Sequence, residues 1–524
     1  MKSSSDTDKE KSRTVSGLKE EYGDWQTNME LALGVCRLLK GRGVDPKVVI
    51  EPTCGKGNFI MAALRVFEHV EDVIGIEING AYLEELRKRL DDGGTGDGRA
   101  HKARVSLYEQ DIFGVDLSHI KQSLKGRETL VLGNPPWVTN SAVTRMGGSN
   151  VPRKSNFRKL GGMDAITGKS NFDVSECICR QMIGLLEGER GYLALLLKNS
   201  VARGIVYGQG NEGLPIANLC QYGIDSRKEF GVSVGASLLC IGMGHGHARS
   251  CKVKDFYTNA DVVEYGWIGD RFVADIDAYQ RYKRIDGRSP LVWRSGIKHD
   301  CVKVMELSLE GRGYVNGFNE EVDIEDDLVY PLLKSSDIKG DEITTARKYV
   351  IVTQRSTSDD TGCMKGRYPK AYRYLTDHAE LLDKRGSRVY EGRARFCIFG
   401  IGTYSFKPYK VVVSGLYKKP CFALVTPIGG KPAMVDDTCY MLGFDNMEEA
   451  RITQRILRSE PVEALIGSLL FADAKRVVNK ELLMRIDLAN ALEMLSPETT
   501  DYSEVKRYRL LLRNSAKPQQ LSLF

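Results

Sequence analysis

The stretch LVLGNPPWVTN, residues 130–140, begins as an apolar run and then changes at once into an amide, two prolines and a tryptophan. Two consecutive prolines cannot continue a sheet ladder, because neither carries a backbone N–H. Proline also restricts the residue before it, so Asn134 and Pro135 are both held extended. The predicted result is a rigid corner that presents the Asn134 amide, the Pro135 carbonyl and the Trp137 ring. These groups suit the binding of a flat molecule.

A second candidate site is EPTCGKGNF, residues 51–59, which follows the apolar strand KVVI. Gly55 and Gly57 lie in the turn of a first strand–turn–helix unit, where glycine lets the backbone approach a ligand closely. The stretch matches neither GxGxxG nor the GK[ST] ending of a P-loop. Glu51 is an awkward neighbour for a pyrophosphate and suits an amine or a cationic centre instead. The same turn can also be purely structural, because isolated motif matches often fail.

Two more acidic residues follow the next two predicted strands. Glu77, twenty residues after Gly57, ends the strand VIGIE. An acid at that place accepts hydrogen bonds from both hydroxyls of a ribose. Asp111, after the third strand in LYEQDIF, could accept a hydrogen bond from an exocyclic adenine amine. An amine, a ribose and an adenine together describe S-adenosylmethionine better than NAD.

The elements that position these residues are short apolar strands alternating with helices. The strands include KVVI, DVIGIEI, RVSLYE, ETLVLG and GYLALLL. This alternation predicts parallel βαβ units and a doubly wound α/β sheet. The motifs then fall at the carboxyl ends of successive strands, the edge where open α/β sheets bind ligands. Thr27 is the predicted N-cap of a helix before the first strand, with Glu30 three residues later.

Composition limits the class of protein. The 524 residues suffice for two or three domains, and the formal net charge of +6 permits a polyanionic partner without requiring one. Twelve cysteines lack a framework spacing and the start of the chain is polar, so we expect free thiols and a cytoplasmic protein. No apolar stretch is long enough for a membrane span. We expect no metal, because the Cys and His residues near position 245 have no zinc-site context.

The ordered set EPTCGKGNF, IEIN, QDIF and GNPPW resembles the amino-methyltransferases that act on DNA bases, specifically the N6-adenine group with the catalytic domain first, the γ-type motif order. The resemblance covers residues 20–245. It implies an α/β fold with a Rossmann-like S-adenosylmethionine-dependent methyltransferase domain at 16–250, followed by a mixed α+β target-recognition domain at 251–513. Residues 1–15 and 514–524 are expected to be tails.

The resemblance also assigns roles to residues. The cofactor-binding residues it implies are Thr27, Glu51, Thr53, Gly55, Gly57, Glu77, Ile78, Asp111 and Ile112. The catalytic tetrad is Asn134, Pro135, Pro136 and Trp137, and Trp137 and Phe230 are expected to stack on the two faces of the target base. Asn28 stands where the family usually has proline, and Trp137 where it often has tyrosine. Asn171 and Asp173 resemble the next motif or cap a helix.

Double-stranded DNA is the partner that the resemblance implies. Basic and aromatic residues interleave in the second half, as in RARFCIFGIGTYSFKPYKVVVSGLYKK, a composition that suits phosphate and base contacts. The DNA-binding residues expected are Arg153, Lys154, Arg158, Arg393, Arg395, Lys407 and Lys410. A separate restriction endonuclease is a further expected partner, and no membrane is expected.

The leading hypothesis is a site-specific adenine-N6 DNA methyltransferase, the modification enzyme of a restriction–modification system. N4-cytosine methylation uses the same chemistry, and Asn134 at the first tetrad position favours adenine. Methyltransferases of RNA bases or of a protein glutamine share such tetrads but usually have small appended domains. A DNA-binding protein without catalysis is disfavoured by the intact acidic residues and Asn134.

Overall fold

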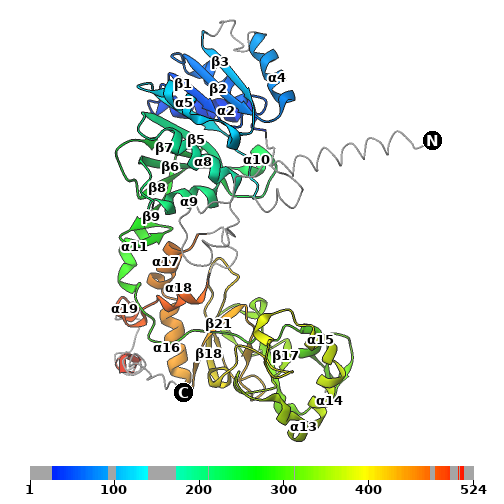
Figure 1. Cartoon of the computed structure of the whole chain (residues 1–524). Coiled ribbons are helices and arrows are strands. Elements are labelled where there is room, and N and C mark those ends of the chain that lie inside the picture. The colour runs from blue at the N-terminus through cyan, green and yellow to red at the C-terminus, as the bar shows by residue number, and fades with distance from the viewer. Residues whose placement is uncertain are drawn as a thin grey trace, which may run out of the picture. The chain divides into compact units, whose positions relative to one another are not determined.

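In the computed structural model the described residues are 26–92, 102–139, 173–210, 212–311, 313–471 and 478–495, together with 506, 508–510 and 512. The chain forms two compact units, Met1–Ile276 and Asp277–Phe524 (Figure 1).

The first unit is built on a ten-stranded sheet with the order β10-β9-β8-β6-β7-β5-β4-β1-β2-β3. Its strands are β1 (Val48–Glu51), β2 (Asp72–Glu77), β3 (Arg104–Glu109), β4 (Thr129–Gly133), β5 (Gly191–Lys198), β6 (Ile216–Ile224), β7 (Ala236–Met243), β8 (Ser250–Asp255), β9 (Asp261–Ile268) and β10 (Arg271–Val273). Strands β3, β2, β1, β4 and β5 are mutually parallel. Every residue of β1 and β4 is buried, as expected for strands covered on both faces.

Helices cover both faces of this sheet. They are α2 (Met29–Gly41), α3 (Asn58–Val66), α4 (Gly80–Asp91), α5 (Leu117–Leu124), α8 (Val174–Leu185), α9 (Asn199–Gly208) and α10 (Ser226–Phe230). Helices α2 and α3 share one core cluster with alternate residues of β5, Ala194 and Leu196. The residues between them face the other side, where α8 and α9 pack against β5 (Figure 1). The predicted doubly wound, mostly parallel α/β sheet is confirmed.

Strands β8, β9 and β10 place the end of the first unit later than residue 250. Strand β8 pairs parallel with β6, and β9 and β10 continue antiparallel from it. They belong to the same sheet as the parallel strands, so the division between the units follows Ile276. Local composition changes near residue 250 because these added strands carry more exposed polar residues than the central ones.

The second unit is a mixed α+β structure with two small sheets. One has the order β11-β21-β18-β19-β16 and the other β14-β13-β12-β17-β15-β20. The strands are β11 (Arg294–Ser295), β12 (Glu306–Glu310), β13 (Gly313–Val315), β14 (Glu321–Val322), β15 (Val329–Leu333), β16 (Glu342–Ile343), β17 (Lys348–Ile351), β18 (Tyr409–Ser414), β19 (Ala423–Val425), β20 (Met434–Val435) and β21 (Cys439–Phe444).

The helices of this part are short. They are α11 (Ile276–Tyr282), α12 (Val302–Met305), α13 (Met364–Arg367), α14 (Pro369–Asp377), α15 (Ala379–Asp383), α16 (Met447–Leu457), α17 (Glu460–Leu469), α18 (Lys480–Met484) and α19 (Leu488–Glu493). Helix α16 packs on β18, β19 and β21. Within the described ranges, no helix combines the length and apolar character that crossing a bilayer requires.

Candidate functional site

The glycine turn between β1 and α3 has a backbone that other residues would strain. Gly55 has a φ of +50° and Gly57 a φ of +76°. A Cβ added to Gly57 would lie 2.2 Å from a methyl carbon of Leu86, and one added to Gly55 would lie 2.8 Å from the side chain of Gln26. Gly57 is therefore required both by its left-handed conformation and by its packing against buried Leu86, and Gly55 by its left-handed conformation.

The carboxylate of Glu77, at the end of β2, closes this turn. It accepts hydrogen bonds from the backbone N–H of Gly55 at 2.8 Å and of Asn79 at 2.9 Å. Glu77 is thus fixed beside the glycine turn, as its position at the strand end predicts. The neighbouring Ile78 is half exposed and offers an apolar surface at the same edge.

Glu51, the last residue of β1, is a buried acid at the floor of the site. It is 3% exposed and accepts a hydrogen bond of 3.3 Å from the backbone N–H of Ile60. Burial raises the pKa of the Glu51 carboxyl well above its ordinary range, and the nearby charge of Glu77 raises it further, against the opposing effect of the Ile60 N–H. A buried carboxyl in this state is ready to ionise beside a cationic ligand.

Asp111 and Ile112 follow β3 on the same edge. Asp111 caps the short 3₁₀ helix η1 (Ile112–Gly114), and its carboxylate accepts a hydrogen bond of 3.0 Å from Phe113 N–H. Ile112 is buried. The cap explains part of the preference for aspartate here, so a ligand contact by Asp111 stays a prediction.

The start of α2 corrects the expected helix cap. Asn28, rather than Thr27, is the N-cap, and its side-chain oxygen accepts a hydrogen bond of 2.8 Å from Leu31 N–H. Its nitrogen donates to Glu229 at 3.0 Å. Asn28 therefore makes two side-chain hydrogen bonds, one accepted and one donated, that the proline usual at this place could not make. Thr27 is buried, and its hydroxyl has no hydrogen-bond partner within the described part of the chain.

The NPPW corner follows β4 beside the floor of the site. β4 is the neighbour of β1, with Val131 opposite Ile50. Gly133, which precedes the corner, has a φ of +154°, and a Cβ there would lie 3.4 Å from Cγ of Glu51. Glu51, at the end of β1, therefore lies beside Gly133, the residue that precedes the corner. Asn134 and Pro136 are half-buried and Pro135 is buried.

Trp137 is anchored in the core. It is 6% exposed, and its indole N–H donates a hydrogen bond of 3.1 Å to the carbonyl of Leu196 in β5. Its ring meets Phe230 edge to face, with centroids 5.1 Å apart and planes at 71°. These are the two aromatics expected on opposite faces of a target base, and here they touch each other. A base between their faces requires the rings to separate.

An ion pair that no local sequence pattern predicts lies beside the corner. Lys198, the last residue of β5, lies 2.7 Å from the carboxylate of Asp173. Asp173 also caps α8 through Ser175 and forms an antiparallel bridge with Thr139. The cap signal in NFDVSE was visible, but nothing local indicated Lys198 as the partner. Asn171 lies outside the described residues.

No family model matches the sequence. A curated relative, the type II methyltransferase M.NspV of Nostoc sp. (strain ATCC 29411 / PCC 7524), is 40% identical over 479 residues, which is 90% of this chain and 98% of the relative. This chain belongs to the type II methyltransferases.

Solved structures give weaker likenesses to this type II methyltransferase. The type IIL restriction-modification enzyme MmeI, solved in complex with DNA, is 13% identical with a TM-score of 0.48, covering 96% of this chain and 73% of its own. The type IIG restriction endonuclease BpuSI is 13% identical with a TM-score of 0.37, covering 93% of this chain and 60% of its own.

The cofactor of this methyltransferase is S-adenosylmethionine, and the described residues fit it. The buried hydroxyls of Thr27 and Thr53 have no hydrogen-bond partner among the described residues. These two threonines lie next to the glycine turn, where their hydroxyls could donate hydrogen bonds to the carboxylate of the cofactor. Glu51 would face the ammonium group and Glu77 the ribose hydroxyls.

Replacing Glu51 with glutamine is expected to weaken S-adenosylmethionine binding and to reduce its pH dependence. Facing a cation favours the ionised carboxylate, so wild-type affinity should rise as the pH increases through the raised pKa of Glu51. The stability of the ligand-free protein depends on pH in the opposite direction to its affinity for the cofactor. Its buried neutral acid contributes stability below the ordinary pKa of 4.5, and that contribution is lost as the pH rises through the folded-state pKa.

Isothermal titration calorimetry from about pH 5.5 to about pH 8 measures this difference. At the upper end the E51Q protein should bind on the order of 10-fold more weakly, because a hydrogen bond to a charged group is lost. The free cofactor titrates identically in both titrations, so a difference between the two pH profiles reports the Glu51 carboxyl and its contact with the bound ammonium. Identical plots of log Kd against pH for the two proteins would contradict the assignment.

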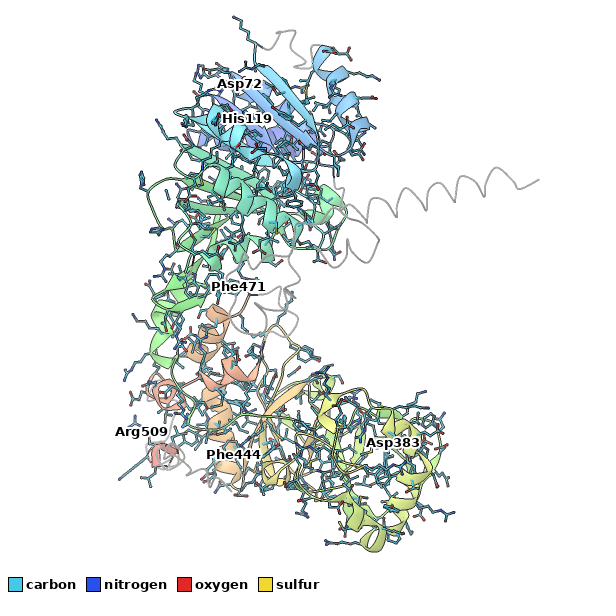
Figure 2. All side chains as sticks on the ribbon, viewed as in Figure 1. Asp72, His119, Asp383, Phe444, Phe471 and Arg509 are labelled. Atoms are coloured by element: carbon cyan, nitrogen blue, oxygen red, sulfur yellow. The ribbon has the colours of Figure 1, made fainter. Side chains whose placement is uncertain are left out.

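The expected DNA-binding residues differ in their surroundings. Arg153, Lys154 and Arg158 lie outside the described residues. Arg393 is exposed. The guanidinium of Arg395 lies 2.5 Å from the carboxylate of Asp383, which is labelled in Figure 2.

Lys407 and Lys410 are also not simply exposed cations. Lys407 forms an ion pair with Asp445. Lys410 is fully buried in β18, where its ammonium group donates a hydrogen bond of 2.6 Å to the carbonyl of Lys407. Burial lowers the pKa of Lys410 to about 7. The prediction that Lys410 contacts DNA is therefore wrong, because its side chain reaches no surface.

Proposed function

We propose that this type II methyltransferase modifies the N6 amine of an adenine that is rotated out of duplex DNA, as the modification enzyme of a restriction–modification system. The observation that carries the proposal is the position of the NPPW corner. It follows β4 directly, and Gly133 abuts Glu51 at the cofactor edge. An amide and a carbonyl are thereby placed beside the strand whose end would receive the cofactor.

The chain's part in the reaction is to orient the amine. The lone pair of an exocyclic adenine amine is delocalised into the ring, so the amine is a poor nucleophile. The side-chain oxygen of Asn134 and the carbonyl oxygen of Pro135 would each accept a hydrogen bond from one of the two N–H groups of this amine. This favours a pyramidal nitrogen whose lone pair faces the methyl donor. S-Adenosylmethionine, when bound, would supply an electrophilic methyl group. The N–CH₃ bond would form as the S–CH₃ bond breaks, leaving the electron pair on sulfur in S-adenosylhomocysteine, and the methylated amine would release one proton to water.

Trp137 and Phe230 would hold the extruded base. Base–aromatic stacking is worth about 1–3 kcal/mol per base, while extrusion costs a few kcal/mol. Their edge-to-face contact at 5.1 Å means that entry of a base must part the rings. Trp137 is fixed through Leu196, so Phe230 on the short helix α10 is the ring expected to move.

The choice of adenine rests on the first residue of the tetrad. Asn134, in place of serine, favours adenine over the N4 amine of cytosine in this family of tetrads. A second unit of more than 200 residues favours DNA over an RNA or protein substrate, because the methyltransferases of RNA bases or of a protein glutamine that share such tetrads usually have small appended domains. A cytoplasmic location and a separate cognate endonuclease are part of the proposal. All twelve cysteines are free, which suits a reducing compartment.

The test is methyl transfer from labelled S-adenosylmethionine to unmethylated genomic DNA, followed by nucleoside digestion and mass spectrometry. N6-Methyladenine is the expected product. N4-Methylcytosine would keep the mechanism and correct the substrate. Label in RNA or protein but none in DNA would overturn the proposal.

A basic and aromatic surface of the second unit is the proposed DNA contact. Its residues are Arg294, Arg355, Tyr404 and Phe406. The guanidinium carbon of Arg355 lies 4.8 Å from the Phe406 ring centre, and that of Arg294 lies 5.1 Å from the Tyr404 ring centre. Tyr404 and Phe406 belong to one 3₁₀ helix, η7 (Thr403–Phe406), two positions apart.

Arg355 is the strongest candidate on this surface. It is exposed, and no carboxylate in the described ranges lies within ion-pair distance of its guanidinium. The two residues before it are anchored through their side chains: the Thr353 hydroxyl donates to the carbonyl of Phe396 at 2.8 Å, and the Gln354 side-chain oxygen accepts from Ile398 N–H at 3.1 Å. The backbone N–H of Arg355 itself donates to the carboxylate of Asp359 at 2.9 Å. An arginine held over a ring on a fixed backbone retains its donors for phosphate or a base edge.

The R355A variant should bind cognate duplex DNA about 10-fold or more weakly, as expected for loss of one arginine contact. Fluorescence anisotropy with a labelled duplex measures the Kd. The matched control is R347A, because Arg347 is exposed but already paired with Asp337 at 2.5 Å. An unchanged Kd for R355A, or an equal loss for R347A, would contradict this surface.

A further inference from the structure

Helix α4 turns one of its faces towards the glycine turn. The residues on that face recur at i, i+3, i+4 and i+7: Tyr82, Glu85, Leu86 and Arg89. Glu85 pairs with the ammonium of Lys56 at 2.8 Å. Leu86 lies so close under Gly57 that a Cβ there would clash with it. The helix therefore supports the turn along most of its length.

Arg89 makes the polar contacts at the end of this face. One guanidinium nitrogen donates to the backbone carbonyl of Lys56 at 2.5 Å, and the other donates to the side-chain oxygen of Asn58 at 2.9 Å. These acceptors lie on either side of Gly57. A planar guanidinium can hold both at a fixed spacing, whereas an ammonium group holds them less rigidly. Arg89 thus spans the left-handed residue of the turn.

Asn58 in turn contacts the start of α2, the helix that precedes β1. Its side-chain nitrogen donates to the backbone carbonyl of Thr27 at 2.6 Å. Because Arg89 is a donor only, it fixes the Asn58 amide with the oxygen towards Arg89 and the nitrogen towards Thr27. The hydroxyl of Thr27 is buried and has no partner within the described part of the chain. The relay therefore ends at a polar group that is left for a ligand.

We propose that Arg89 is a positioning residue for S-adenosylmethionine, acting through Asn58 on Thr27 and through Lys56 on the glycine turn. It fixes two parts of the cofactor site that come from different elements, the start of α2 and the turn before α3. The proposal rests on the methyltransferase assignment and not on which base is methylated. Its deciding measurement, the Kd for S-adenosylmethionine, uses the cofactor alone, so the proposal can fail or hold independently of the proposed DNA target.

The experiment is titration calorimetry of the full chain with S-adenosylmethionine, without DNA. The R89A variant should bind on the order of 10-fold more weakly, since two charge-assisted hydrogen bonds are lost. R89K should recover part of the loss. The matched control is R87A, because Arg87 is exposed two positions earlier on α4 and should leave the Kd unchanged. At saturating cofactor, kcat of R89A should stay within about twofold while KM for the cofactor rises.

A double-mutant cycle tests the relay itself. N58A, R89A and the double variant should lose affinity non-additively, with the double variant close to the worse single variant. If R89A does not fold, R89K and N58A carry the same comparison. An unchanged Kd in R89A, or in R89K and N58A where those stand in for it, would overturn the proposal. So would additive losses, or a loss of thermal stability with no change in Kd.

Discussion

Replacing Asn134 with alanine should reduce the rate of methyl transfer by about 10²–10³-fold, the loss measured when one preorganised polar group is removed from a reacting centre. The alanine side chain leaves one N–H of the target amine without an acceptor, so the nitrogen stays planar. A single-turnover assay with labelled S-adenosylmethionine and duplex DNA measures the rate. Asn134 lies at the end of β4 and is half-buried, so the fold should tolerate the change.

The control for this variant is cofactor affinity. Asn134 is not placed among the cofactor-binding residues, so the Kd of N134A for S-adenosylmethionine should match that of the wild type. N134D keeps an acceptor oxygen and should retain more activity than N134A. An unchanged single-turnover rate in N134A would exclude the proposed role of the amide.

Replacing Trp137 with alanine should lower the free energy of unfolding by about 3–5 kcal/mol, the range for removal of a large buried aromatic. Trp137 is 6% exposed and belongs to the same core cluster as α2 and α3. The variant also loses the hydrogen bond to Leu196, leaving that carbonyl without its donor. Urea denaturation measures the loss, and 2-aminopurine fluorescence in duplex DNA measures retention of the extruded base.

W137F separates the two roles of this residue. Phenylalanine keeps an aromatic face but not the indole N–H, so it should recover most of the packing and retain base stacking. If W137F restores stability but not the fluorescence signal, the stacking role is wrong. If W137A unfolds at the wild-type urea concentration, the anchoring through Leu196 contributes little.

Much of the site followed from sequence because its residues are adjacent to strand ends. The glycine turn, Glu77 and the NPPW corner each continue directly from an apolar strand, so predicting the strands also placed the motifs. The sequence predicts the N-cap of α2 at Thr27, one residue before the observed cap, Asn28. Thr27 and Asn28 are both good N-caps, and in the structure Asn28 is also held by a hydrogen bond to Glu229, which lies 201 positions away. No local pattern contains that information.

The DNA-contacting residues of the second unit are harder to predict from sequence, again because distant parts of the chain decide their surroundings. Lys410 belongs to an interleaved basic and aromatic stretch, but its strand β18 lies between β19 and β21 and is buried on the Lys410 face as well. Arg395 is of a residue type that commonly contacts phosphate, but its guanidinium group already forms an ion pair with the carboxylate of Asp383. Composition shows which residues could contact DNA. Burial and ion pairing decide which of them remain able to do so.

The bridge between Thr139 and Asp173 has a consequence for how β4 and α8 are held in place. Val174 N–H also donates to the carbonyl of Val138 at 2.8 Å, so the chain leaves β4 and returns to α8 at nearly the same point. The end of β4 and the start of α8 are thus tied to each other directly, so the register of this strand and this helix is set by these contacts and not by the length of the chain between them.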